Sequence, residues 1–457
     1  MEDTICAIST SAGNSGIGII RLSGKDSFKI IEKIFKPKNK YKKIIGYSIK
    51  YGNIINPKNN KVIDEVLVSF FVHPKSFTTE DMCEINTHGG MIVEKEILNI
   101  CLENGARIAE AGEFTKRAFL NGRIDLAQAE AIQDLISSKS KKEAEESLNQ
   151  LEGTLSKKLK EINNGLLDLM VNLNVLIDYP EYDIEELSSM NAKKQLNTIK
   201  LLLEKLELSF EQGKILRDGV KTVIVGKPNS GKSSLLNTIL KEDRAIVSSI
   251  EGTTRDTIEE YITINGLTLR IIDTAGIRDT ENEIEKIGVD KSKKMAESAD
   301  LIIAVFDLSR KLDNEDGLIL DLIKDKTSII VLNKKDLKEK NEEIEGYIKS
   351  LDKPIIKISA QTEEGIDDLY SQISNMFEIK ELENSNDILI TNERHKNQIR
   401  KAKENVEKAI ESLEQGCPID IITINIQEAM DDIGEILGTN VTEDIINEIF
   451  KRFCLGK

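Results

Sequence analysis

Residues 222–234 read TVIVGKPNSGKSS, an apolar run that enters a loop with two glycines and is followed by the apolar stretch LLNTIL. Gly226, Gly231, Lys232 and Ser233 fit the pattern GxxxxGK[ST], in which a strand leads through a phosphate-binding loop into a helix. The glycines let backbone N–H groups surround phosphate oxygens at the helix N-terminus, the lysine reaches the β- and γ-phosphates, and the serine ligates Mg²⁺. The stretch therefore predicts a nucleotide-phosphate site between a strand and a helix.

The sequence around this loop predicts the fold. Further short apolar runs follow it: LRIIDT (269–274), LIIAVFD (301–307), SIIVLN (328–333) and PIIKIS (354–359). Each run enters a loop and most lead into a helical pattern, which is typical of a parallel sheet with helices on both faces. We predict a doubly wound, mostly parallel α/β domain over residues 218–379.

Three further motifs indicate the nucleotide. DTAG (273–276) follows a strand and brings a carboxylate toward the metal and a glycine N–H toward the γ-phosphate. NKKD (333–336) also follows a strand, and Asp336 can accept hydrogen bonds from both N1–H and the exocyclic amine of guanine, a pair that adenine does not offer. ISA (358–360) places a backbone N–H where it can meet guanine O6. Together the motifs predict a guanine-specific P-loop GTPase.

The predicted nucleotide site also includes the segment between the loop and DTAG. Thr254 is the natural threonine of the first switch loop, because its hydroxyl joins Mg²⁺ when the γ-phosphate orders that loop. The predicted GTP contacts are Asn229, Ser230, Gly231, Lys232, Ser233, Ser234, Ser248, Ser249, Ile250, Glu251, Gly252, Thr253, Thr254, Asp273, Thr274, Ala275, Gly276, Asn333, Lys334, Lys335, Asp336, Ser359 and Ala360. The residue after DTAG is Ile277, whose aliphatic side chain cannot orient an attacking water as the glutamine of Ras-like proteins does. We expect catalytic groups besides Lys232 to come from elsewhere in the chain.

Composition narrows the class of protein. The chain has 457 residues, with 63 basic and 79 acidic side chains that give a net charge of −16. Bulk electrostatics cannot hold so acidic a chain on nucleic acid. No apolar run in the sequence approaches the roughly 20 residues that span a bilayer. Five scattered cysteines and three histidines suggest neither a disulfide framework nor a multi-histidine metal centre. We expect a cytoplasmic protein.

The pattern of the chain changes along its length. Residues 1–118 mix short alternating strands with helices and glycine turns, as in an α+β domain. Residues 119–217 and 380–457 carry apolar residues at the helical spacings of three and four. Since neither helical stretch looks complete alone, we expect the two to pack together as one helical domain, into which the α/β domain of residues 218–379 is inserted.

The motifs together resemble the MnmE (TrmE) family of tRNA-modification GTPases. They run in order along the chain: SFTTED (76–81), GEFTKRAFLNGRIDLAQAEAI (112–132), GKPNSGKSSLLN (226–237), GTTRD (252–256), DTAGIRDTENEIEKIG (273–288), NERH (392–395) and FCLGK (453–457). The resemblance implies K⁺-stimulated GTP hydrolysis in which Glu285 orients the attacking water. It implies K⁺ ligation by Asn229, Ser248, Ile250 and Thr253, in the manner of oxygens that replace a hydration shell, and Mg²⁺ ligation by Ser233 and Thr254. Without the resemblance, Glu285 is better explained as a solvated carboxylate at a helix start in an acidic stretch.

The resemblance also implies a function and partners. Family members form homodimers and act with an FAD-dependent partner protein in a heterotetramer. Together the two proteins place an aminomethyl or carboxymethylaminomethyl group on C5 of the wobble uridine (position 34) of certain tRNAs. The one-carbon unit comes from 5-formyl- or methylene-tetrahydrofolate bound to the N-terminal domain, which is also the dimerisation domain.

Four residues match folate contacts of the family: Arg21, Glu80, Arg123 and Lys457. A carboxylate suits the paired N–H donors of a pterin edge, and cations suit the glutamyl tail of folate. Arg123 stands where many members carry lysine, and without the resemblance each residue is equally well explained as part of a surface ion pair. Cys454 is implied as a catalytic thiol in the uridine chemistry, since a thiol can add to C6 of a pyrimidine.

Two other functions compete with this interpretation. A K⁺-dependent GTPase switch in ribosome assembly shares the loop asparagine, but such proteins usually carry a basic RNA-binding module. The C-terminal part of this chain is helical in pattern and lacks a GXXG loop among basic residues. A stand-alone folate aminomethyltransferase with a regulatory GTPase is the third alternative, and folate binding without a tRNA product would favour it.

Overall fold

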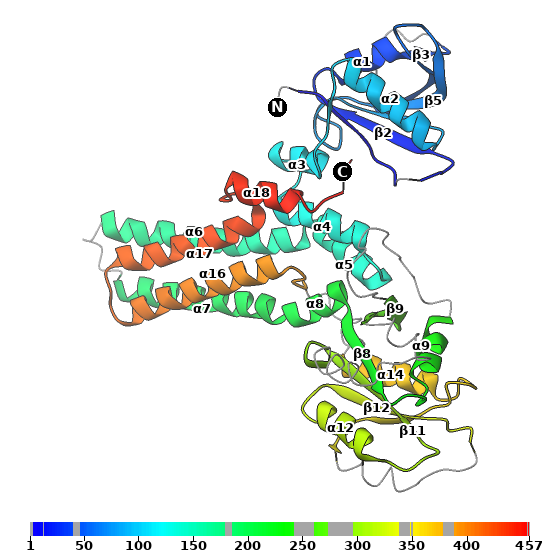
Figure 1. Ribbon diagram of the computed structural model, residues 1–457. Coiled ribbons are helices and arrows are strands. Elements are labelled where there is room, and N and C mark those ends of the chain that lie inside the picture. The colour runs from blue at the N-terminus through cyan, green and yellow to red at the C-terminus, as the bar shows by residue number, and fades with distance from the viewer. Residues whose placement is uncertain are drawn as a thin grey trace. The chain divides into compact units, whose positions relative to one another are not determined.

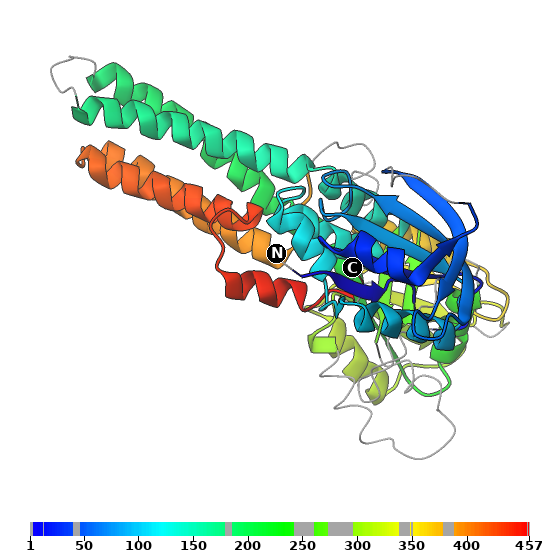
Figure 2. The ribbon, with the colours of Figure 1, turned by 90° about the horizontal axis from the view of Figure 1, so that it is seen from above.

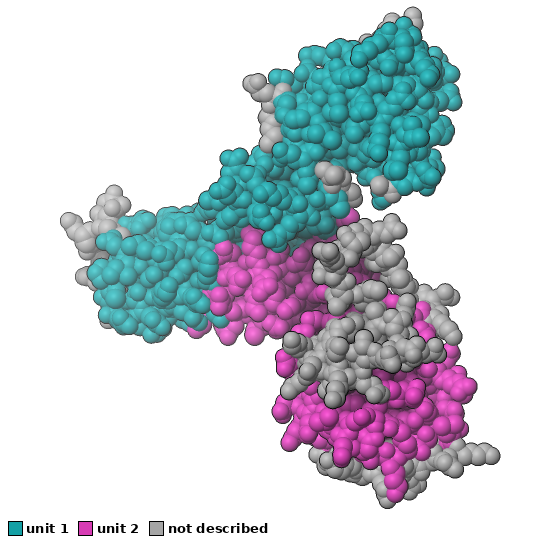
Figure 3. Space-filling model, in the orientation of Figure 1, with its two compact units in different colours: residues 1–133, 149–199, 401–457 teal, residues 134–148, 200–400 magenta. Residues whose placement is uncertain are grey.

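The computed structural model describes residues 3–11, 13–39, 46–178, 185–241, 260–272, 296–337, 348, 351–377, 388–454 and 456. The chain divides into two compact units, shown in different colours in Figure 3. Unit 1 comprises residues 1–133, 149–199 and 401–457, and unit 2 comprises residues 134–148 and 200–400. Each unit is therefore assembled from segments that are far apart in the sequence.

A mixed sheet forms the N-terminal part of unit 1 (Figure 1). Its strands lie in the order β3 (Phe35–Pro37), β4 (Ser48–Ile55), β5 (Val62–Phe71), β6 (Met82–Thr87), β2 (Gly18–Ser23), β1 (Ile5–Ile8) and β7 (Arg107–Ile108). Neighbouring strands pair antiparallel except β1 and β7, which are parallel. Helices α1 (Ser27–Ile34) and α2 (Met91–Glu103) share a core with the sheet that includes Ile31, Val68 and Ile97. The α+β fold that the sequence predicts is confirmed.

The remainder of unit 1 is helical. It contains α3 (Glu113–Leu120), α6 (Thr154–Asp178), α17 (Ile419–Leu437), α18 (Glu443–Phe450) and most of α4 (Leu126–Ser137). Helices α6 and α17 lie side by side (Figures 1 and 2). Each buries an apolar stripe at spacings of three and four, with Leu159, Leu166 and Leu173 among the buried residues of α6. The helical domain is thus built from two separate chain segments, because each stripe needs the other as a partner.

Unit 2 contains the predicted α/β sheet. The strand order is β13 (Ile355–Lys357), β12 (Ser328–Asn333), β11 (Leu301–Asp307), β8 (Val220–Gly226), β10 (Leu267–Ile271) and β9 (Glu260–Ile264). All neighbours are parallel except β9 and β10. Strands such as β11 are buried along their whole length, as strands covered on both faces must be. The prediction of a doubly wound, mostly parallel sheet is confirmed.

Helices cover both faces of this sheet. Helices α9 (Lys232–Lys241) and α14 (Ile366–Met376) contribute Leu235 and Leu369 to one core cluster. Helix α12 (Asn314–Ile323) contributes Ile323 to a second cluster that uses the alternate residues of the same strands. Unit 2 also contains α8 (Phe210–Asp218), and the division between the units falls within α4, α5 (Lys141–Leu151), α7 (Glu185–Leu208) and α16 (Glu393–Glu414). Among the described residues, no helix has the length and apolar character needed to cross a membrane.

Candidate functional sites

The loop of residues 227–231 joins the end of β8 to the start of α9. Asn229 and Gly231 have positive φ angles of 61° and 97°. A Cβ on Gly231 would lie 2.0 Å from Nδ2 of Asn333, and a Cβ on Gly226 would lie 2.5 Å from the carbonyl oxygen of Val305. Both glycines of the GxxxxGK[ST] pattern are therefore required by the close approach of neighbouring groups.

Asn333, the first residue of NKKD, connects this loop to the loop that carries ISA. Its Nδ2 donates a hydrogen bond to the Ser230 carbonyl at 3.0 Å, and its Oδ1 accepts one from the Ala360 N–H at 3.0 Å. The hydroxyl of Thr238 on α9 donates to the Ala360 carbonyl at 2.9 Å. The Ala360 N–H, which the sequence assigns to guanine O6, is thus engaged by Asn333 in this structure.

Polar groups at the start of α9 suit an anion. Burial lowers the pKa of Lys232 to about 8, and its Nζ donates to the Lys227 carbonyl at 2.8 Å. The hydroxyl of Ser230 is buried and has no hydrogen-bond partner among the residues that the structure describes. A phosphate would supply the negative charge that this lysine lacks and an acceptor for buried donors. The helix N-terminus favours the same ligand.

The remaining residues of NKKD differ in their contacts. Lys334 pairs with Asp307 at 2.6 Å, and Lys335 pairs with Glu364 at 2.6 Å. Asp336 is exposed, so its carboxylate is accessible to a base from solvent. These two ion pairs therefore hold in place the loop from which Asp336 would bind guanine.

Several predicted site residues lie outside the described part of the chain. They are Ser248, Ser249, Ile250, Glu251, Gly252, Thr253, Thr254, Asp273, Thr274, Ala275, Gly276, Glu285 and Lys457. The structure brings together the loop residues, Lys232, Ser233 and the NKKD and ISA residues at one edge of the parallel sheet.

A pocket of about 550 Å³ opens in unit 1. Its lining includes the apolar side chains of Phe71, Phe77 and Met82 and the polar side chains of Glu84, Asn121 and Arg123. This volume lies within the range of about 300–1,000 Å³ typical of small-molecule sites, and such sites combine apolar walls with a few polar groups. The pocket thus has the size and chemistry of an organic-ligand site.

Two of the predicted folate contacts meet on one aromatic ring in this region. The Arg123 guanidinium lies 4.8 Å from the centre of the Phe77 ring and donates to the Phe77 carbonyl at 2.7 Å. The Arg21 guanidinium lies 5.7 Å from the same ring and pairs with Glu84 at 2.8 Å. Glu84 was missed by sequence reasoning, although it lies directly opposite Arg21 in the β2–β6 ladder. A correct strand register would have found it.

Glu80, the third predicted folate contact, lies in the connection between β5 and β6 rather than in the pocket lining. Its Oε2 accepts a hydrogen bond from the Ser23 hydroxyl at 2.7 Å, and Nη1 of Arg117 donates to both carboxylate oxygens at 3.1 Å. Arg117 is completely buried and was also missed from the sequence. Its signal is weak, since the motif around it reads as an ordinary helix.

The C-terminal tail contacts the N-terminal sheet of unit 1. The Ser9 hydroxyl donates to the Gly456 carbonyl at 3.0 Å, and the Gly112 N–H donates to the Cys454 carbonyl at 3.3 Å. Gly456 has a φ of 84°, and a Cβ there would lie 2.3 Å from the Ile8 carbonyl oxygen. The Cys454 side chain is exposed, which leaves the thiol accessible.

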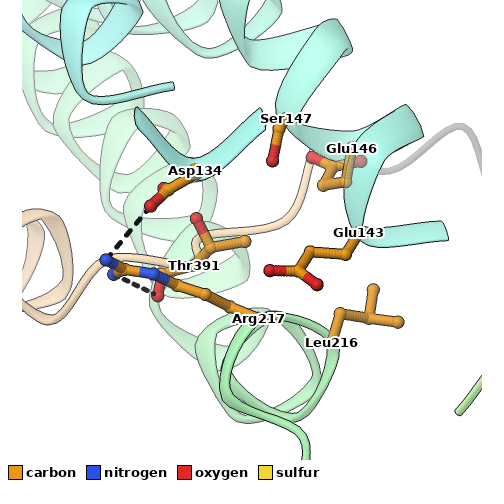
Figure 4. A pocket seen from close by; sticks show the side chains of 7 residues that line it. All are labelled: Asp134, Glu143, Glu146, Ser147, Leu216, Arg217 and Thr391. Carbon is orange, nitrogen blue, oxygen red and sulfur yellow. Dashed lines mark hydrogen bonds and ion pairs between the residues drawn. The ribbon is translucent and has the colours of Figure 1, made fainter. Parts of the chain in front are cut away.

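Unit 2 also holds a small polar cavity of about 10 Å³, room for about one water (Figure 4). Arg217 of α8 pairs with Asp134 of α4 at 3.1 Å and donates to the Thr391 carbonyl at 3.4 Å. Glu143 of α5 points toward the same space, and burial raises its pKa to about 7. The cavity is too small for a nucleotide or a folate, and we treat it as part of the packing of unit 2.

The parallel sheet, the loop of residues 226–231 and the Asn333 bridge define a P-loop GTPase domain. Comparison with known proteins identifies the family. The family model of the MnmE helical domain matches residues 126–454, and that of the N-terminus of the GTP-binding protein TrmE matches residues 4–123. The chain belongs to the MnmE family of tRNA modification GTPases.

Relatives named tRNA modification GTPase MnmE align along the whole chain. Those of Acetivibrio thermocellus and Clostridioides difficile are each 49% identical, over 458 and 461 residues, and the alignments cover 100% of this chain and 99% and 100% of the relatives. The relative of Finegoldia magna is 46% identical over 460 residues, with 100% of both chains covered. A solved G domain of the T. maritima FeoB iron transporter is 26% identical over 34% of this chain and 97% of its own, with a TM-score of 0.26, too low to bear on the fold.

Proposed function

We propose that this chain is the GTP-hydrolysing subunit of a complex that modifies C5 of the wobble uridine of certain tRNAs. The observation that carries the proposal is the full-length identity of 49% to chains named tRNA modification GTPase MnmE. The group added is aminomethyl or carboxymethylaminomethyl. Loss of that modification from tRNA in cells without the protein is the experiment that tests it.

GTP binds at the loop of residues 226–231 in this proposal. Backbone N–H groups of the loop and Lys232 hold the phosphates, while Ser233 and Thr254 ligate Mg²⁺. The lowered pKa of Lys232 and the buried Ser230 hydroxyl support an anionic ligand at this place. The exposed carboxylate of Asp336 reads the guanine edge.

Asp336→Asn tests the base assignment directly. An asparagine side chain offers an N–H donor where the carboxylate accepts, so it pairs better with the C2 carbonyl of xanthine than with the amine of guanine. We expect the variant to lose GTP hydrolysis by about 100-fold or more and to hydrolyse XTP instead. A variant that hydrolyses neither nucleotide although it is folded, or that keeps its GTP activity, would contradict this role.

K⁺ stimulates hydrolysis from a site beside the phosphates, where it is ligated by Asn229, Ser248, Ile250 and Thr253. Asn229 is exposed in the loop and has a positive φ of 61°. Glu285 orients the attacking water, because Ile277 cannot.

Asn229→Ala is expected to retain GTP binding and to lose the difference in rate between K⁺ and Na⁺. Asn237→Ala, an exposed residue of α9, is the matched control. Stimulation that persists in Asn229→Ala would remove Asn229 as a ligand.

A tetrahydrofolate, carried as its 5-formyl or methylene derivative, occupies the pocket of unit 1. The volume of the pocket, about 550 Å³, and its aromatic and charged lining support this ligand. Arg123, which lines the pocket, binds the anionic tail together with Arg21 and Lys457. Glu80, whose near neighbours Phe77 and Thr79 line the pocket, accepts hydrogen bonds from the pterin. Folate supplies the one-carbon unit, and the exposed Cys454 thiol is the nucleophile proposed for the uridine.

The proposed assembly is a homodimer that joins an FAD-dependent partner protein in a heterotetramer, in the cytoplasm. A net charge of −16 supports an arrangement in which the partner protein contributes much of the binding to tRNA. We propose four parts of the chain: a folate-binding and dimerisation domain over 1–118, the two parts of the helical domain over 119–217 and 380–457, and the GTPase domain over 218–379.

A further inference from the structure

Arg117 on α3 is completely buried although it carries a charge. Its Nη1 contacts both oxygens of Glu80 at 3.1 Å and the Asp3 carbonyl at 3.0 Å. Its Nη2 contacts the carboxylates of Asp3 at 2.9 Å and Glu113 at 3.0 Å. A buried guanidinium is costly unless its donors are paired, and Nε of Arg117 has no partner among the described residues. The contacts of Nη1 and Nη2 therefore strongly constrain the carboxylates around them.

The three carboxylates differ in their dependence on Arg117. Arg107 also contacts Asp3 at 2.7 Å and Glu113 at 2.6 Å, so those two have a second cation. Among the described residues, Glu80 forms ion pairs with Arg117 alone. Glu80 therefore depends on Arg117 for its charge partner, whereas Asp3 and Glu113 do not.

The segment that carries Glu80 is held from two sides. From the end of α3, Asn121 donates to the Thr78 carbonyl at 2.7 Å, and Arg123 donates to the Phe77 carbonyl at 2.7 Å. From β2, the Ser23 hydroxyl contacts Thr78 Oγ1 at 2.6 Å and Glu80 Oε2 at 2.7 Å. The neighbours Phe77 and Thr79 line the large pocket. The same contacts that fix Glu80 thus fix one wall of that pocket.

We propose that Arg117 and Ser23 are positioning residues that hold the Glu80 carboxylate in place for an N–H donor of a pterin. The inference rests on the proposed folate site and names two residues through which that site works. Arg117 has no exposed surface, so it can affect a bound ligand only through the residues that it contacts, whereas the Glu80 side chain keeps 14% of its surface exposed. A carboxylate has about four acceptor sites, and the contacts to Ser23 and Arg117 take three, so about one remains for an N–H donor of a ligand.

A double-mutant cycle on the full-length chain tests this coupling. Binding of 5-formyltetrahydrofolate is measured by titration calorimetry for the wild type, Arg117→Lys, Glu80→Gln and the double variant. We expect each single variant to lose affinity by roughly 10- to 100-fold, as for hydrogen bonds to a charged group. The double variant is expected to match Glu80→Gln within about twofold, because Arg117 has no effect once Glu80 is changed.

Arg107→Lys is the matched control, because Arg107 shares Asp3 and Glu113 with Arg117 but does not contact Glu80. We expect it to lower thermal stability and to leave folate affinity within about twofold of the wild type. If Arg117→Lys does not fold, Ser23→Ala replaces it in the same cycle.

The outcomes separate the inference from the proposed function. A wild-type chain that binds no 5-formyltetrahydrofolate contradicts the folate site, and with it the inference. A wild-type chain that binds, together with losses that add up in the double variant or with unchanged affinity in both Arg117→Lys and Ser23→Ala, leaves the folate site intact and overturns the positioning role.

Discussion

The side chain of Asn333 donates a hydrogen bond to the carbonyl of Ser230 at 3.0 Å, which joins NKKD, the proposed guanine-binding motif, to the proposed phosphate-binding loop. The other end of the same amide accepts from Ala360. One asparagine thereby fixes the spacing between the loop of residues 227–231 and the ISA loop, the proposed places for phosphate and base. Its buried position, with 2% of its surface exposed, makes the loss of these bonds costly.

Asn333→Ala is expected to destabilise unit 2 in the absence of nucleotide. Two buried groups lose their partner, which costs about 1–3 kcal/mol each. A lower Tm of the nucleotide-free protein measures this effect separately from any direct contact with guanine. Asn314→Ala, an exposed position at the start of α12, is the control and is expected to leave the Tm unchanged. An equal Tm for Asn333→Ala and the wild type would contradict the bridging role.

Nucleotide binding is expected to take up a proton above about pH 8. Burial lowers the pKa of Lys232 to about 8, and a bound phosphate raises the pKa again by its negative charge. Below that pH the lysine is already protonated, so the affinity is flat; above it, the affinity falls as pH rises. Calorimetry of GDP binding at pH 8.5, in two buffers with different ionisation enthalpies, measures the uptake directly. Equal heats in both buffers would show that Lys232 binds no proton.

Glu143→Gln is expected to change how the stability of unit 2 depends on pH. Burial raises the pKa of Glu143 from 4.5 to about 7, so the folded chain holds a proton that the unfolded chain releases between these values. The contribution of Glu143 to the free energy of unfolding therefore declines as pH rises from about 4.5 to 7, and the neutral glutamine removes this part of the pH dependence. Glutamine keeps an oxygen that can accept from the Lys139 N–H, now at 2.6 Å. Parallel Tm curves for both proteins from pH 5 to 8 would contradict the assignment.

Gly456→Ala is expected to release the C-terminal tail. The new Cβ would meet the Ile8 carbonyl at 2.3 Å, and the φ of 84° adds strain of about 1 kcal/mol. Carboxypeptidase digestion is then expected to become several-fold faster. Gly416→Ala is a close control, because Gly416 also has a positive φ of 65° but no atom lies within 4 Å of its Cβ. Equal digestion rates for the two variants would show that the tail does not depend on this contact.

Local sequence was enough to predict the phosphate-binding loop, because the residues that define this loop are adjacent in the sequence. The motif demands glycines at the two places where Asn333 and Val305 leave no room for a side chain. The pairing of the two helical segments was also predictable, since an apolar stripe such as that of α6 has to be buried somewhere. In each case a short stretch contained the physical requirement.

Strand β9 was missed and could have been found. It pairs antiparallel with β10 through a turn at Asn265 and Gly266, both with positive φ angles. An Asn-Gly pair between two alternating runs is a strong hairpin signal. The strand order of both sheets could not be predicted, because the pairing of distant strands depends on packing rather than on any local pattern.

The ion network of Arg117 could not be predicted from spacing. Arg117 and Glu113 are four residues apart on one helix, but Glu80 and Asp3 reach them only through the fold. The contact between Glu84 and Arg21 likewise depends on the register of β2 and β6. Sequence reasoning finds ligands that sit in motifs, and it overlooks the residues that hold those ligands in place.

The modification state of tRNA tests the central claim most directly. Nucleosides from the tRNA of cells without the protein are compared by mass spectrometry with those of the same cells complemented by the wild type or by Asp336→Asn. We predict that the C5-substituted wobble uridine disappears, that the wild type restores it, and that Asp336→Asn does not. An unchanged amount of that nucleoside in cells without the protein would contradict the proposed function.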